Sequence, residues 1–270
     1  MPDNMALATD TGLAQRLAEI KEKNPHAYPR DYAAELGISE AQLTPVYYAG
    51  RAQELPSLSA VFESLAKLAR VKLMARTSFA VFELFTRVDF HREGSALVLK
   101  SATCFTALNG DERGSVYFIA PASEKEKAAI LIFDKAGAAA LKVYIEAHEF
   151  DVALLKAATD APTRHNTDIR ELLEKNRALP ESTAAEPTPR LLIEGAAAKG
   201  KVGFELVTAA IAVSMQHAPV KVVDARGWFN ILDEDFNLHL KEEAVTKVTA
   251  GKTLRIENAS GEAIDLWRIS

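Results

Sequence analysis

Histidines and one cysteine are the side chains of this 270-residue sequence best suited to hold a metal or move a proton. His165 lies in a polar segment just before a helix predicted over 167–175. His217 ends a predicted strand, two residues before Pro219, and His239 stands between two leucines on another strand. A structural role explains each of them as well as a ligand role does. The others are expected in exposed loops or at a helix start: His26, His91 and His148.

Three consecutive acids, Asp233-Glu234-Asp235, fall on a predicted tight turn between two strands. Carboxylates this close together can hold a cation, but a solvated turn is the better interpretation. No two histidines have the i, i+4 spacing of a helical zinc site, and the sequence contains no GxGxxG, no GxSxG and no Gly-rich phosphate loop. These absences argue against zinc, dinucleotide and serine-hydrolase chemistry.

Residues 31–43 have the pattern of a helix-turn-helix, with Gly37 in the turn and Ser39 as the cap of the second helix. That second helix begins Glu40-Ala41-Gln42-Leu43 and offers no Arg or Lys to phosphate or guanine. The formal net charge of the chain is −5, which also disfavours a polyanion. We expect no nucleic-acid partner.

The segment from Gly227 to Leu240, GWFNILDEDFNLHL, is not a generic pattern. It resembles the signature of the bacterial haemin-degrading and haem-trafficking factor family, cytoplasmic proteins that receive imported haem. The similarity continues through Val245, and Gln216–Lys221 resembles the segment before the signature. The resemblance extends over most of the chain from about residue 14. It implies a duplicated fold, with haem in a cleft between a sheet and a helix.

The sequence departs from the family at the positions that matter most for iron. Where the family has an iron-ligating histidine after Thr-Asp-Val, this chain has Arg170, which follows Ile169. Arginine stays protonated and does not ordinarily coordinate iron, so it suits a haem propionate better. A family arginine on the opposite haem face falls near Thr106, and a first-repeat histidine matches Phe82. Substitute ligands are therefore sought at His165, slightly preferred, and at His217, with His239 less favoured.

The elements that position these residues follow an internal repeat. Both halves show helices followed by short apolar, β-rich segments. Ile132–Gly137 and Ile256–Gly261 each read as a strand end and an Asx-started turn with Gly, leading into an eight-residue strand. The openings align as Leu73–Thr77 with Glu205–Ala209. The predicted fold class is α+β, with two structural repeats, each a large antiparallel sheet with flanking helices.

A Pro-rich stretch at 178–190 is the predicted linker. Residues 1–160 are expected to hold the N-terminal helices and the first sheet repeat, and 161–270 the linker helices and the second. A hydrophobic content of 48% is ample for a core. Cys104 alone cannot form an internal disulfide, and neither a signal peptide nor a membrane span is visible. A reducing cytoplasm is expected.

Two functions remain open. The first is a cytoplasmic haem-binding protein of haem and iron utilisation, for carriage or storage or for oxidative, haem-oxygenase-like degradation. Its partners would be haem and a haem importer or a downstream haem-handling protein. The second is a diverged, non-catalytic paralogue that binds another ligand or acts as an interaction module.

Overall fold

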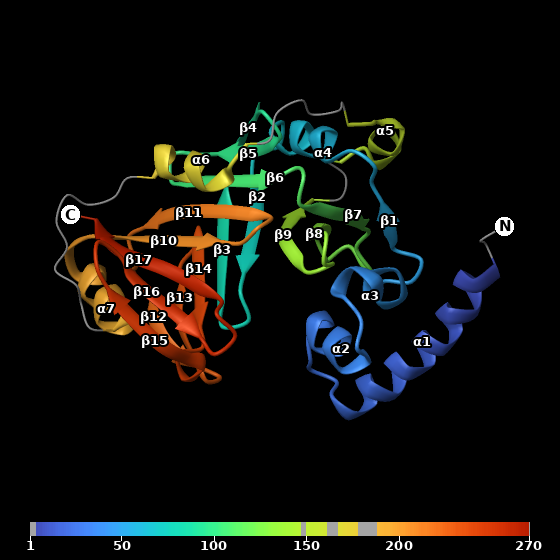
Figure 1. Cartoon of the computed structure of the whole chain (residues 1–270), viewed down its shortest axis with the longest axis horizontal. Helices are drawn as coiled ribbons and strands as arrows, with labels where there is room; N and C mark the ends of the chain where they lie inside the picture. Colours follow the sequence, from blue (N-terminus) through green and yellow to red (C-terminus); the bar gives the residue numbers. More distant parts are fainter. Residues whose placement is uncertain (1–3, 147–149, 161–166, 178–187, 270) are drawn as a thin grey trace.

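The computed structural model describes residues 4–146, 150–160, 167–177 and 188–269 as helices, strands and their connections (Figure 1). The helices are α1 (Asn4–Lys23), α2 (Pro29–Leu36), α3 (Glu40–Tyr47), α4 (Leu58–Leu65), α5 (Val152–Ala157), α6 (Ile169–Asn176) and α7 (Pro189–Lys199). Within the described ranges, no helix is long and apolar enough to cross a membrane.

The strands of the first half are β1 (Ala52–Glu54), β2 (Val71–Arg76), β3 (Ala80–Thr86), β4 (Asp89–Glu93), β5 (Ala96–Lys100), β6 (Cys104–Asn109), β7 (Arg113–Ile119), β8 (Ala128–Asp134) and β9 (Ala139–Ile145). Those of the second are β10 (Lys201–Val207), β11 (Ile211–His217), β12 (Val222–Ala225), β13 (Trp228–Leu232), β14 (Phe236–Leu240), β15 (Val245–Ala250), β16 (Leu254–Asn258) and β17 (Ala263–Ile269). The sequence did not predict β1, β4, β6 or β15.

Two antiparallel sheets are built from these strands, and each takes strands from both halves of the chain. Sheet A has the order β1-β7-β8-β9-β2-β3-β14-β13-β12, and sheet B has the order β15-β16-β17-β10-β11-β6-β5-β4. Apart from β1, every strand of sheet A has a counterpart at the same place in sheet B, eight strands away in chain order. The predicted fold class is therefore confirmed. The finer finding is that the two repeats exchange three strands, so the boundary near residue 160 does not separate the sheets.

The matching turns of the two repeats have the same hydrogen bonds. Asp134 Oδ1 accepts from the N–H of Ala138, and Asn258 Oδ1 accepts from the N–H of Glu262. The turn glycines have φ +80° at Gly137 and +81° at Gly261.

The predicted alignment of the sheet openings was wrong by one residue. Thr77 and Thr208, not Ala209, are equivalent, because each hydroxyl accepts from the N–H two and three residues later. In a strand, such a shift would exchange the two faces of the sheet.

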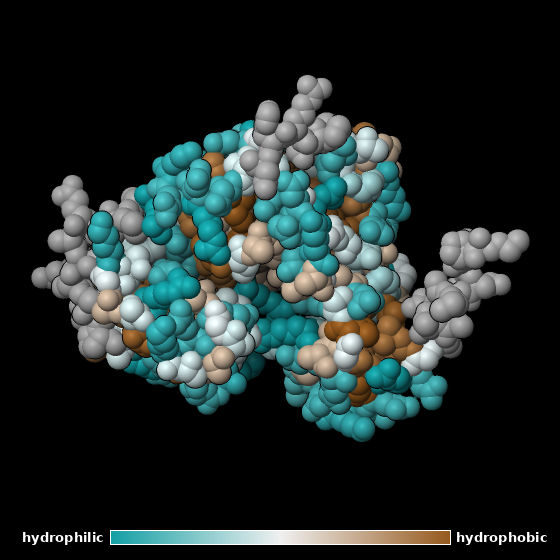
Figure 2. All heavy atoms as spheres, viewed as in Figure 1, coloured by the Kyte–Doolittle hydropathy of each residue, from teal (hydrophilic) through white to brown (hydrophobic). Residues whose placement is uncertain are grey.

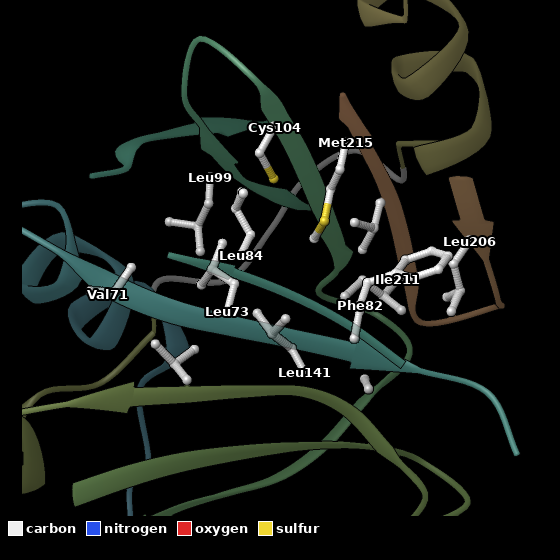
Figure 3. Close-up of a cluster of buried hydrophobic side chains, with 14 of the residues drawn as sticks. Val71, Leu73, Phe82, Leu84, Leu99, Cys104, Leu141, Leu206, Ile211 and Met215 are labelled. Carbon is white, nitrogen blue, oxygen red and sulfur yellow. The ribbon is translucent and has the colours of Figure 1, made fainter. Parts of the chain in front are cut away.

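The main core lies between the two sheets. Alternate residues of β2, β3, β13 and β14 face alternate residues of β10, β11, β5 and β6. Figure 3 shows part of this core, where Phe82 and Leu84 of sheet A meet Leu206, Ile211 and Met215 of sheet B. Phe82, at the position of the family's first-repeat histidine, is fully buried and packs on Phe204.

Helices cover the outer faces of the sheets at non-equivalent places. Gly37, in the left-handed conformation, ends α2, and Ser39 caps α3. Ala41 of α3 packs against a buried cluster of β7 and β8, so the helix predicted to resemble a recognition helix is docked on sheet A. On sheet B, α6 packs on β6 and β11 (Figure 1). The strands β3, β14 and β13, which are the counterparts of β11, β6 and β5, lie away from α3.

The two turn glycines provide a matched test of the repeat. Alanine in the left-handed region costs about 1–2 kcal/mol, so Gly261→Ala should lower the free energy of unfolding by about that amount. A Cβ at Gly137 would in addition lie 2.6 Å from Cβ of Ser39, whereas a Cβ at Gly261 meets nothing within 4 Å. Gly137→Ala should therefore cost at least about 1 kcal/mol more. Urea denaturation measures both, and equal losses would contradict the predicted clash.

Candidate functional site

The face of sheet B under α6 is the place that the family resemblance assigns to haem. Here α6 lies directly on the sheet through Ile169, Leu172 and Leu173. The apolar side chains of the sheet in this contact offer no iron ligand: Ala96, Val98, Phe105, Ala107 and Ala212.

Arg170 lies in the first turn of α6 and is exposed. Its backbone N–H is capped by Asp168 Oδ1 at 2.8 Å, which fixes the start of the helix and leaves the guanidinium at its surface. At the other end of the helix, Arg177 pairs with Glu205 of β10 at 3.0 Å. Burial raises the pKa of Glu205, and Arg177 opposes that rise. The role of Arg170 toward a propionate stays a prediction.

His217 is held by a hydrogen bond and a ring contact at the end of β11. Its Nε2 lies 2.6 Å from Oδ2 of Asp233, and its ring stacks on Phe236 with centroids 4.8 Å apart. Asp233 also accepts hydrogen bonds from the N–H groups of Val220 and Lys221. A ligand role for His217 stays a prediction, and it requires this pair to open.

Asp233 is not the solvated turn residue that the sequence predicted, because its side chain is 8% exposed. Burial acts to raise the pKa of this carboxyl, but the hydrogen bonds from His217, Val220 and Lys221 outweigh burial and lower it. Only Glu234 and Asp235 of the acidic run are exposed. Among the described residues, no group of three His, Cys, Asp or Glu side chains is placed to hold a metal ion.

Two further candidates from the sequence are His165 and Cys104. His165 lies outside the described residues, so its role as an iron ligand stays a prediction. Cys104 is buried, and burial raises the pKa of its thiol to about 11 although the Thr106 hydroxyl lies 3.4 Å from its sulfur. Such a thiol stays protonated at neutral pH and is a poor ligand or nucleophile.

His239 lies on the outer face of sheet A, on β14, and is half-buried. Its Nδ1 is 2.7 Å from Oδ1 of Asn230, the residue directly opposite on β13. The Asn230 amide nitrogen donates to the carbonyls of Trp228 and Val223, at 2.7 and 3.3 Å. The amide oxygen is therefore the acceptor, so the imidazole proton is on Nδ1 and the lone pair is on Nε2.

Charged side chains continue this face across β3, β2 and β9. Lys72 pairs with Glu83 at 2.8 Å, and Asn237 donates to the same carboxylate. Next to them Glu40, from α3, binds both Arg76 and Lys142, at 2.7 and 2.6 Å. Burial lowers the pKa of Lys142, an effect that Glu40 opposes.

Figure 2 shows a hollow with a hydrophilic floor between the α2–α3 region and the C-terminal strands. This shape and the charged side chains of β2, β3 and β9 make the outer face of sheet A a polar, partly enclosed surface with one neutral imidazole. Such a surface can bind an anionic group and offer one nitrogen to a metal centre.

Sequence reasoning placed His239 correctly on an outward sheet face but missed Asn230. The signal was available, because a hairpin through the turn at 233–235 places position 230 opposite 239. An Asn facing a His in such a pair fixes the tautomer of the ring.

The pKa of His239 gives a test of this environment. Burial lowers it from the ordinary value of 6.5; Lys72 adds to this effect, whereas Glu83 opposes it. The unfolded chain then binds a proton more readily than the folded one, so stability is full above about pH 6.5 and falls as the pH drops through that value. Wild type should lose stability from about pH 7 to about pH 5 more steeply than His239→Gln. Urea denaturation across that range measures the slopes, and parallel curves would contradict the prediction.

Comparison with known proteins bears on the whole chain. No family model matches it. It is 30% identical over 140 residues to the hemin transport protein HmuS of Yersinia pestis, a match that spans half of this chain and 41% of HmuS. The fold matches the heme degrading enzyme ChuS of Escherichia coli O157:H7 with a TM-score of 0.74 and 21% identity, over 97% of this chain and 94% of ChuS.

The fold also matches holo-PhuS, a heme-binding protein from Pseudomonas aeruginosa, with a TM-score of 0.75 and 20% identity over the same shares of both chains. These full-length structural matches and the half-chain sequence match confirm the resemblance drawn from the 227–240 segment. By its fold, the chain is similar to ChuS and PhuS over nearly its full length.

Proposed function

We propose that this chain is a haem-binding protein of haem and iron utilisation, and that it carries or stores haem in the cytoplasm. The observation that carries the proposal is the duplicated, strand-exchanged fold, shared over nearly its full length with a heme-binding protein and a heme degrading enzyme. Haem, when bound, supplies the redox chemistry, and the protein supplies the ligand, the orientation and the surrounding charge.

The side chains under α6 can be compared with the parts of haem that they would contact. The cluster in which α6 packs on the sheet is apolar, and Arg170 at the helix start suits a carboxylate. That arrangement fits the hydrophobic ring and a propionate but supplies no iron ligand. We therefore place carriage ahead of degradation, because oxidative breakdown needs an iron held on one face and open to oxygen on the other.

The alternative is a diverged paralogue that keeps the fold and binds another ligand. The specific observation in its favour is the direct packing of Ile169, Leu172 and Leu173 on the sheet, where the family resemblance places haem. A haem importer or a downstream haem-handling protein remains the partner that we propose for the first function.

Titration with ferric haemin, followed by absorption spectroscopy, tests the two functions. The first predicts a saturable, one-to-one shift of the Soret band. If no saturable Soret shift occurs at haemin concentrations well above micromolar, the second function, a diverged paralogue with another ligand, is favoured.

Arg170→Ala tests the propionate contact. With haem under α6, loss of one charge-assisted hydrogen bond should weaken haemin binding about tenfold, equivalent to about 1.4 kcal/mol, without changing the visible bands that report the axial ligand. Lys175→Ala is the matched control, because it removes one exposed positive charge from the far end of the same helix. Equal affinities of the two variants would refute a specific role for Arg170.

A further inference from the structure

The twofold repeat makes the faces of the two sheets comparable residue by residue. β3 pairs with β14 as β11 pairs with β6: Leu84 lies opposite Phe236 where Met215 lies opposite Cys104. Three residues further along β14 and β6, His239 is therefore equivalent to Ala107. Asn230 lies opposite His239 on β13, and Val98 lies opposite Ala107 on β5, so Asn230 is equivalent to Val98.

The equivalent positions carry opposite chemistry. On sheet B they form the apolar surface that α6 covers, including Val98, Phe105 and Ala107. On sheet A they are Asn230, Asn237 and His239, and the helix that packs on this sheet, α3, lies over β8 instead. Placing amides and an imidazole on a partly buried strand face costs free energy unless each group is hydrogen-bonded, and here the Asn230 amide and the imidazole Nδ1 are. The polar set is therefore ordered by its own hydrogen bonds.

One atom of this set remains available. His239 Nε2 makes no hydrogen bond within the described residues, where every fully buried side-chain nitrogen and oxygen has a partner. Nε2 is therefore at the surface of the face, with its lone pair outward, while Asn230 holds the ring from behind. A carbonyl group on the far nitrogen of an imidazole is the usual support of a metal-binding histidine.

We propose that His239 Nε2 is the axial ligand of an iron tetrapyrrole that lies on the outer face of sheet A. This inference rests on the proposed function and moves its iron site from the α6 face to the other sheet. The ligand class follows from the number of donors. A bare cation needs three or four protein ligands, which are not grouped among the described residues, whereas a tetrapyrrole brings four nitrogens and needs one or two more.

The cluster around Glu40 has the charge on this face that can attract the carboxylates of such a ligand, and its Arg76 and Lys142 side chains are 14% and 9% exposed. Arg76 is two strands away, about 10 Å across the sheet, on the same face. Arg76 and Lys142 share the single carboxylate of Glu40, so this cluster has an excess of one positive charge. Lys72 and Glu83, in the same region, neutralise each other.

The test compares ferric haemin complexes of the wild type, His239→Ala and the control His91→Ala, in which an exposed histidine of β4 is removed. Affinity, absorption and electron paramagnetic resonance spectra are recorded, and circular dichroism verifies that each variant is folded. We expect imidazole-type spectra for wild type and the control. His239→Ala should lose that signature and at least tenfold in affinity. With His239→Gly, added imidazole should restore the wild-type bands.

The outcomes separate this inference from the function on which it rests. Unchanged spectra and affinity in His239→Ala, with haemin still bound, overturn the ligand assignment and leave haem binding intact. A loss of the imidazole signature in His217→Ala instead also overturns it, and places the iron beside Asp233. If the wild-type protein does not bind haemin at all, the proposed function fails and the ligand assignment fails with it.

Discussion

The structure depends on strand pairing between the two halves of the chain. The β3–β14 and β11–β6 pairings each align five pairs of residues that are more than 100 positions apart in the sequence. Without them, each half would expose two sheet edges and the apolar side chains that form the core between the sheets. The aromatic contacts at the centre follow the same exchange, because Phe204 packs both on Phe82 and on Phe236. Neither half can therefore bury its own core alone.

This exchange gives the protein two equivalent outer faces, which have different side chains. Small and apolar side chains on β5 and β6 accept α6 directly. On β13 and β14 the Asn230–His239 pair excludes such packing, since an apolar helix would leave the Nε2 lone pair buried and unpaired. The two repeats thus differ on the surfaces where a ligand or a helix lies, while the glycine turns stay alike.

The parts of the fold that were predictable are those fixed by local chemistry. An Asx residue, a glycine at positive φ and the following strand identify each repeat, so Gly137 and Gly261 were found from the sequence alone. The edge strands β4 and β15 were missed because most of their side chains are exposed and lack an apolar face. The strand exchange was not predictable, because it depends on contacts far apart in the sequence. The buried state of Asp233 was missed for the same reason: the His217 that covers it comes from the other sheet.

The packing of α6 makes ligand binding on the covered face of sheet B costly. Lifting the helix from sheet B would expose Ile169, Leu172 and Leu173, which are each at most 3% exposed. Burying side chains of this size contributes about 1.5–3 kcal/mol each, so the displacement costs roughly 5–9 kcal/mol. At about 1.4 kcal/mol per tenfold, that is a penalty of about three to six powers of ten on the dissociation constant. A ligand on the outer face of sheet A displaces no helix. The side chains of that face are already held in place, His239 by Asn230 and Lys72 by Glu83. A fold with two comparable outer faces can therefore bind a ligand on sheet A, where we propose His239 as the iron ligand, without displacing α6.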